Sequence, residues 1–191
     1  MLLVERPEML TARIKQLRTQ YHFRTRLRRS TNKFQLDFAK KLLDYFFKEP
    51  DLRFAARVLT ERTAQNETQS YRNELYKFHY KQFLRDNFPT GKGVVITLIK
   101  TSRFAADRVL QELRSEISLV EQINVVSVSS NDILQMTGFI ARYVCGEAPN
   151  PAALSNHTKV EILHDLRSRL GVATLLDPSL SRKRKFRIQT G

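Results

Sequence analysis

Hydrophobic residues recur at helical spacing in several stretches of the chain. Apolar side chains that return every three or four positions mark one face of a helix. The ends of these stretches fit as well, since Pro7 suits a first helical turn, Asn32 is a good N-cap and Gly171 suits a helix end. The pattern predicts helices over residues 7–21, 32–49, 69–88, 102–117, 131–144 and 157–171.

Shorter stretches have the pattern of strands, in which side chains alternate between two faces. Val94–Ile99 is continuously apolar and rich in β-branched residues, which predicts a central strand covered on both faces. The closing stretch 185–189, "KFRIQ", predicts an edge strand. Further strands are predicted over residues 23–28, 52–60 and 123–130. Strands that alternate with helices predict an α/β fold, with helices packed on the faces of a sheet.

The length of 191 residues suits one domain with a substantial core. We therefore expect a single α/β domain over residues 1–191, with residues 181–191 forming a basic C-terminal strand or tail. The only cysteine, Cys145, lies in an apolar helical run and indicates a reducing, cytoplasmic setting. We expect no contact with a membrane, because the first residues lack the apolar core of a signal peptide and no stretch approaches the roughly 18 apolar residues of a span.

Positive charge is concentrated at the two ends of the chain. The net charge is +14 at pH 7, which favours a polyanionic partner. Residues 1–40 hold ten Lys and Arg against three Asp and Glu, and residues 167–191 hold seven against one. If the two ends meet in the fold, they will form one basic face.

The stretch "HFRTRLRRST" carries one arginine cluster and no acid. Guanidinium groups bind phosphate oxygens bidentately and release counterions from nucleic acid. The alternative is a solvated edge strand that its charges protect from pairing with other chains. The candidate nucleic-acid-binding residues in this cluster are Arg24, Arg26, Arg28 and Arg29.

A second basic run, "SRKRKFR", lies near the C-terminus. It is a candidate phosphate contact or, alternatively, a frayed end that serves only solubility. The candidate nucleic-acid-binding residues in this run are Arg182, Lys183, Arg184 and Lys185.

The helix predicted over residues 69–88 mixes aromatic and basic side chains. Such a mixture can stack nucleic-acid bases. Tyr76, Tyr80 and Phe83, however, share one helical face, so packing in a core is the better interpretation.

The sequence lacks the usual arrangements of catalytic residues. A two-metal nuclease needs carboxylates that converge at strand ends, and the predicted strands over 53–60, 94–99 and 123–129 contain no Asp or Glu. His157 and His164 are seven positions apart, whereas two helical metal ligands are usually four apart. Cys145 has no neighbouring His or cationic cluster to activate it. We expect no cofactor, no metal and no catalytic residue.

Several phrases of the sequence nevertheless resemble one protein family. They are "KKLLDYFFKEPDLRFAARVL", "YKFHYKQFL", "VVSVSSNDILQMTGFIARYV" and a closing "KFRI". Together they resemble a large bacterial family of uncharacterised domains, the DUF3800 type, which looks RNase H-like in fold. The resemblance covers most of the chain from Pro7 onward, and it implies an RNase H-like mixed sheet flanked by helices.

The carboxylates that the resemblance implies are missing. Family members open with an Asp-Glu-Ser-Gly strand and a second strand, and this chain begins too late to contain them. A Glu expected near Arg26 and an Asp expected between Thr97 and Lys100 have no counterpart. Of the Gln-x-x-Asp phrase, the Gln is kept as Gln135, whereas Gly138 stands at the Asp position.

These observations favour a catalytically inactive RNase H-like domain that binds nucleic acid through its basic terminal segments. A protein-interaction or structural subunit of a larger complex is the alternative. A third, weaker hypothesis is a metal-dependent nuclease that uses Asp132 or Glu67. A sheet without its first two strands would expose an edge, so we expect a second protein chain or a second copy to cover that edge, or a true start upstream.

Overall fold

The computed structural model describes residues 1–23, 33–58, 69–87, 94–99, 120–127, 131–146 and 157–190. The chain divides into two compact units. The first unit joins Met1–Leu59 to Asp132–Gly191, and the second consists of Thr60–Asn131. The two ends of the sequence therefore belong to the same unit.

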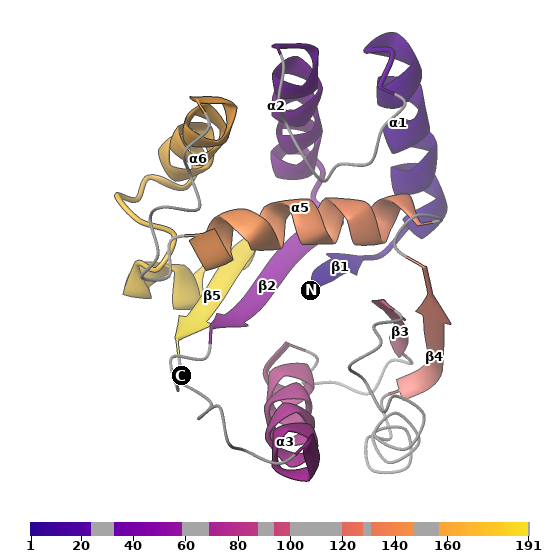
Figure 1. The fold of residues 1–191 in the computed structure, drawn as a ribbon, viewed down its shortest axis with the longest axis vertical. Coiled ribbons are helices and arrows are strands. Elements are labelled where there is room, and N and C mark those ends of the chain that lie inside the picture. Colours follow the sequence, from indigo (N-terminus) through magenta and orange to yellow (C-terminus); the bar gives the residue numbers. More distant parts are fainter. Residues whose placement is uncertain are drawn as a thin grey trace. The chain divides into compact units, whose positions relative to one another are not determined.

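The first unit contains helices and a small sheet (Figure 1). Its elements, in chain order, are β1 (Leu2–Val4), α1 (Pro7–Gln20), α2 (Lys33–Lys48), β2 (Leu52–Val58), α5 (Asp132–Gly146), α6 (His157–Leu170), the 3-10 helix η3 (Pro178–Arg182) and β5 (Phe186–Thr190).

The sheet of the first unit has the strand order β1-β2-β5. β1 runs antiparallel to β2, with Leu3 opposite Arg53, and β5 runs parallel to β2, with Arg187 opposite Ala55. The first and last strands of the chain thus lie on either side of β2. This confirms the α/β class and the predicted strand near the C-terminus, which lies at one end of the strand order.

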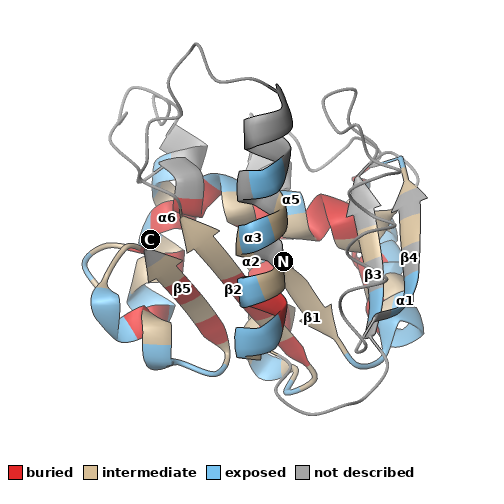
Figure 2. Cartoon of the chain, turned by 90° about the horizontal axis from the view of Figure 1, so that it is seen from below, coloured by how far each residue is buried: buried red, intermediate tan, exposed pale blue. Residues whose placement is uncertain are grey.

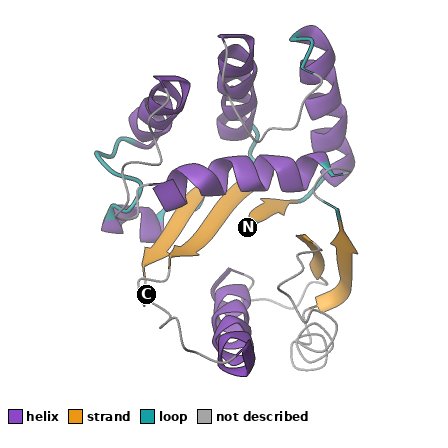
Figure 3. Cartoon of the chain, viewed as in Figure 1, coloured by secondary structure: helices purple, strands orange, loops and turns teal. Residues whose placement is uncertain are grey.

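Among the described residues, the core cluster of the first unit takes side chains from one face of this sheet, and Ala55, on the other face of β2, is buried as well. Buried residues of α1, α2, α5 and α6 form one cluster with Leu52 and Phe54 of β2 and with Phe186 and Ile188 of β5. α5 crosses the three strands and contacts β1 and β2 (Figure 3). Buried and intermediate residues along β2 and β5 are visible in Figure 2. Side chains alternate along a strand, so the other face of β2 and β5 points away from this core.

Two helices of the first unit end in the same backbone arrangement. Gly171, with φ of 66°, follows α6, and the amide of Val172 bonds to the carbonyl of Arg167 over 3.1 Å. After α1, His22 takes the equivalent left-handed position with φ of 49°, and the amide of Phe23 bonds to the carbonyl of Arg18 over 2.8 Å. Both are Schellman motifs, in which glycine is the usual residue.

The second unit contains α3 (Gln69–Asn87), β3 (Val94–Ile99) and β4 (Val120–Val126). β3 and β4 pair in parallel, with an irregularity between Val94 and Val95. Val95 is 53% exposed, so the expected burial of this strand on both faces is wrong at that position. β4 begins three residues before the predicted start and includes the exposed Glu121, so the expectation of acid-free strands is wrong there.

The predicted helices that the structure describes are confirmed, with ends that differ by at most two residues. The strand β1 was not predicted. Phe23 lies outside any strand and is buried in the core, whereas the rest of the strand predicted over 23–28 and the helix predicted over 102–117 lie outside the described residues. None of the described helices combines the length and the apolar content needed to cross a lipid bilayer.

Candidate nucleic-acid interface

The basic run Arg182–Lys185 joins η3 to β5, and both of its lysines bond to the ends of helices. Lys183 Nζ donates a hydrogen bond to the carbonyl oxygen of Leu170, the last residue of α6. Lys185 Nζ donates to the carbonyl oxygen of Glu49, directly after α2. The last carbonyls of a helix lack partners within the helix and carry its negative dipole end. Both lysines are therefore structural caps.

Lys185 is also partly buried among aromatic and charged groups. Its Nζ lies 4.7 Å from the centre of the Phe46 ring. Burial lowers the pKa of Lys185, and the nearby Arg53 lowers it further, whereas Glu49 and Asp51 raise it. This lysine is held inside the fold and is a poor candidate for contact with an external phosphate.

The two arginines of the same run are arranged differently. Arg182 and Arg184 are exposed, and neither forms a hydrogen bond or an ion pair with any residue that the structure describes. The backbone that carries them is fixed on both sides. Leu180, just before them, is fully buried, and the carbonyl of Lys185, just after them, accepts a 2.9 Å bond from the amide of Phe54. The run is thus an anchored turn with two outward cations.

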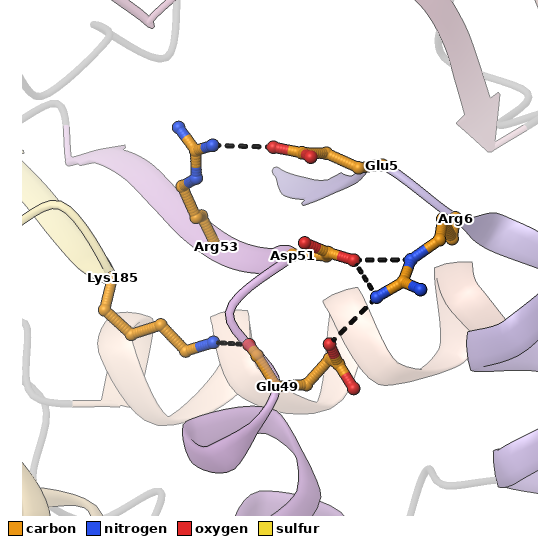
Figure 4. Close-up of polar contacts among 6 residues, drawn as sticks. All are labelled: Glu5, Arg6, Glu49, Asp51, Arg53 and Lys185. Atoms are coloured by element: carbon orange, nitrogen blue, oxygen red, sulfur yellow. Dashed lines mark hydrogen bonds and ion pairs between the residues drawn. The ribbon is translucent and has the colours of Figure 1, made fainter.

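A cluster of charges surrounds the α2–β2 turn (Figure 4). Arg6 pairs with Asp51 and, at 3.5 Å, with Glu49, and Arg53 Nη2 lies 2.7 Å from Glu5 Oε1. The pKa of Arg6 is raised by its hydrogen bond to Asp51. Together with Lys185, the cluster holds three positive and three negative groups, and its ion pairs tie β1, the start of α1 and β2 together.

Gln135 and Asp132 both bond to Arg18, near the end of α1. Arg18 Nη2 lies 2.9 Å from Gln135 Oε1, and its Nε lies 3.1 Å from Asp132 Oδ1. The arginine and aspartate side chains are each 17% exposed. A guanidinium beside Asp132 opposes the binding of a metal cation to that carboxylate. Gly138 is exposed and has open space around it.

The arginine cluster Arg24, Arg26, Arg28 and Arg29 lies outside the described residues, as does Glu67. Phe23, the residue directly before this cluster, is buried, and its ring stacks on Phe38 with the ring centroids 4.4 Å apart. In α3, Phe83 is buried as core packing predicts, whereas Phe78 is 60% exposed.

Sequence reasoning missed the cations of the sheet. Arg53 and Arg57 on β2 and Arg187 on β5 occupy positions that alternate with the core residues of these strands. The sequence signal that could have revealed them is the alternation of arginines with core residues in "LRFAARV" and "FRIQ". It becomes informative only when β2 and β5 are known to pair.

Among the described residues, no group of three or more His, Cys, Asp or Glu side chains is arranged so that it could hold a metal ion. Comparisons of the chain with protein-family models, with curated proteins and with solved structures found no match in any of the three.

Proposed function

We propose that this protein is an RNase H-like domain that binds nucleic acid without cleaving it. Arg182 and Arg184 contact the phosphate backbone, and Arg24, Arg26, Arg28 and Arg29 add further contacts. Lys183 and Lys185, which belonged to the same candidate set, act as helix caps that hold the two arginines in place.

The observation that supports this proposal is the division within the run Arg182–Lys185. Its lysines bond to helix ends, and its arginines are exposed without a partner among the described residues. Guanidinium groups bind phosphate bidentately, and an anchored backbone reduces the entropy lost when they do so. A net charge of +14 adds a long-range attraction for polyanions.

The binding is expected to be independent of sequence. Contacts to phosphate fix the position of a protein on nucleic acid but carry no direct information about the bases. Binding should weaken steeply with salt, because each neutralised phosphate releases condensed counterions.

Fluorescence anisotropy with a labelled single-stranded oligonucleotide, measured from 50 to 300 mM salt, tests the proposal. The double variant Arg182→Ala/Arg184→Ala should reduce the slope of log K against log salt by about 1.4, since each phosphate contact to a single strand contributes about 0.7. The matched control is Lys15→Ala/Lys41→Ala, which removes two exposed cations from α1 and α2 of the same unit. Equal losses in both variants, or no binding by the wild type at 50 mM salt, would contradict the proposal.

The absence of cleavage is part of the proposal. It is supported by the guanidinium of Arg18 beside Asp132 and by the lack of a carboxylate at Gly138, where the resemblance expects one. Purified protein incubated with Mg²⁺ or Mn²⁺ should leave DNA and RNA intact. Cleavage that disappears in Asp132→Asn or in Glu67→Gln would reverse this part of the proposal.

The alternative function is a structural or interaction subunit that pairs with another chain. The observation that favours it is that, among the described strands, β1 and β5 each pair only with β2, and unpaired strand edges invite pairing. Light scattering decides it, because a monomer has a mass of 22.3 kDa. The single cysteine suits a cytoplasmic setting for either function.

A further inference from the structure

The strand β1 lies at one end of the strand order and is entirely apolar. Its residues, Leu2, Leu3 and Val4, all have intermediate exposure. Proteins commonly protect an edge strand from pairing with charged residues, proline or a bulge. β1 contains no charged residue and no proline, and its register with β2 is regular. An apolar edge of this kind favours pairing with another strand.

The hydrogen bonds between β1 and β2 show which backbone groups point outward. Met1 and Ala55 exchange two bonds, of 2.6 and 3.0 Å. In an antiparallel pair, such hydrogen-bonded residues alternate with residues whose backbone groups face the other side. Leu2 and Val4 therefore direct their amide and carbonyl groups away from β2.

These outward backbone groups have no partner among the residues that the structure describes. β1 pairs only with β2 there, and neither Leu2 nor Val4 makes a further hydrogen bond. The other end of the strand order is different, because Arg187 and Gln189 of β5 make additional contacts within the fold. Of the two edges, β1 is the one with available backbone donors and acceptors.

We propose that β1 pairs with β1 of a second copy of this chain, antiparallel and about a two-fold axis at Leu3. In this register Leu2 is opposite Val4 of the second copy, and Val4 is opposite its Leu2. Each of these two pairs exchanges two hydrogen bonds. The pairing thus satisfies all the outward amide and carbonyl groups of both strands.

The spacing of the outward residues selects a second copy as the occupant. A two-fold axis brings together residues that lie equally far from it, and Leu2 and Val4 flank Leu3 symmetrically. An axis at Leu2 or at Val4 would place only one of the two opposite a residue of β1. The edge is therefore complementary to itself in one symmetric register.

The side chains of β1 are compatible with this pairing. Leu2 and Val4 pack against the core of their own unit, so Leu3 lies on the opposite face of the strand. At the axis, Leu3 and its copy form a non-hydrogen-bonded pair, in which the Cα atoms are about 4.5 Å apart. Two leucines in contact bury apolar surface there, and β1 brings no like charges together.

This inference does not rest on the binding of nucleic acid. It specifies the partner, the edge and the register for the structural role named above as the alternative function. Arg182 and Arg184 precede β5, at the other end of the strand order, so pairing at β1 does not involve them. Dimerisation and oligonucleotide binding are measured separately, and either can fail alone.

Light scattering of the full chain over a range of concentrations tests the inference. The wild type should approach twice the monomer mass of 22.3 kDa as the concentration rises. Leu3→Glu places two carboxylates at the axis, where like charges oppose pairing, and should stay at the monomer mass. The control is Met9→Glu, at a 56% exposed apolar position of α1, which should dimerise like the wild type.

Two outcomes of this measurement would overturn the inference. One is a wild type that remains monomeric at every concentration. The other is a Leu3→Glu variant that dimerises as well as the wild type, because the copies would then meet through a different surface.

Crosslinking tests the register without relying on a charged variant. Under mild oxidation, Leu3→Cys should form a disulfide-linked dimer, because a Cα separation of about 4.5 Å lies within the range of disulfides. The matched control is Met9→Cys, and both variants retain Cys145. If Leu3→Cys gave no more crosslinked dimer than Met9→Cys, the register would be wrong.

Hydrogen exchange of the wild type needs no variant and does not depend on whether the variants fold. The amides of Leu2 and Val4 should exchange more slowly as the protein concentration rises, whereas the amide of Leu3, which faces β2, should change less. Slow exchange of Leu2 and Val4 in a protein that stays monomeric would mean that the same chain covers this edge, and the inference would fall.

Discussion

Arg18 Nη2 lies 2.9 Å from Gln135 Oε1, which joins the end of α1 to the first turns of α5 across 117 positions of sequence. The same guanidinium bonds to Asp132 and lies over the ring of Phe23 at 5.2 Å. One partly buried side chain thus connects α1, the start of α5 and the residue that precedes the arginine cluster. Gln135, which a family resemblance singles out, has a structural partner in this fold.

Removal of Arg18 should therefore destabilise the first unit. Arg18→Ala leaves Asp132 and Gln135 without this donor, and hydrogen bonds to charged groups contribute about 1.5–3 kcal/mol each. We expect the free energy of unfolding, measured by urea titration, to fall by about 2–3 kcal/mol. The matched control Lys15→Ala, at an exposed position of the same helix, should change it by less than about 0.5 kcal/mol. Similar values for the two variants would show that the contacts of Arg18 contribute little.

The two Schellman motifs predict opposite effects of glycine substitution. His22 has φ of 49°, a conformation that costs a residue with a Cβ about 1 kcal/mol. His22→Gly should raise the free energy of unfolding by about 0.5–1 kcal/mol, and Gly171→Ala, at φ of 66°, should lower it by about 1 kcal/mol. Thermal denaturation checks both. A loss of stability in His22→Gly would mean that its side chain makes a contact that outweighs the backbone strain.

The ion pair between α2 and α6 predicts part of the response to acid. Arg169 Nη1 lies 2.7 Å from Asp44 Oδ1, and this bond lowers the pKa of Asp44 below its usual 3.8. A carboxyl whose pKa is lowered by folding adds stability above its unfolded pKa, and this stability is lost as the pH falls through the folded value.

The free energy of unfolding should therefore decrease below about pH 5, and Asp44→Asn should show a smaller decrease between pH 6 and pH 3 than the wild type. Glu8→Gln, which removes an exposed carboxylate from α1, serves as the control and should follow the wild type. An Asp44→Asn profile parallel to that of the wild type would contradict this assignment.

The helices were predictable because each carries an apolar stripe that repeats within its own sequence. The strand β1 was not, because its three residues, Leu2–Val4, carry no recognisable period and are fixed by pairing with β2, some fifty positions away. The same reason hid the cations of the sheet. Arg57 and Arg187 lie 130 positions apart in sequence, and only the parallel register of β2 and β5 makes them neighbours.

The candidate site could be predicted from sequence only as a set of cations. The run Arg182–Lys185 shows four positive charges and gives no sign of which of them reach a helix end. That choice depends on where α2 and α6 stop relative to β5, which is a property of the folded chain. Composition thus identified the basic segment, and tertiary structure separated its capping lysines from its exposed arginines.

This separation leads to the last prediction, in which stability and binding respond to different residues of one run. Lys183→Met/Lys185→Met removes two donors from helix ends and should lower the free energy of unfolding by about 1 kcal/mol per site. It should change the salt slope of oligonucleotide binding little. Arg182→Ala/Arg184→Ala should do the reverse, because neither side chain is bonded to a described residue.

Each variant removes two positive charges from the same four positions, so a difference between them cannot come from net charge. Unfolding in urea and binding at several salt concentrations, measured on both variants, provide the comparison. If the lysine variant lost as much salt slope as the arginine variant and kept its stability, the contacts with Leu170 and Glu49 would not be caps, and all four cations would act as one diffuse basic patch.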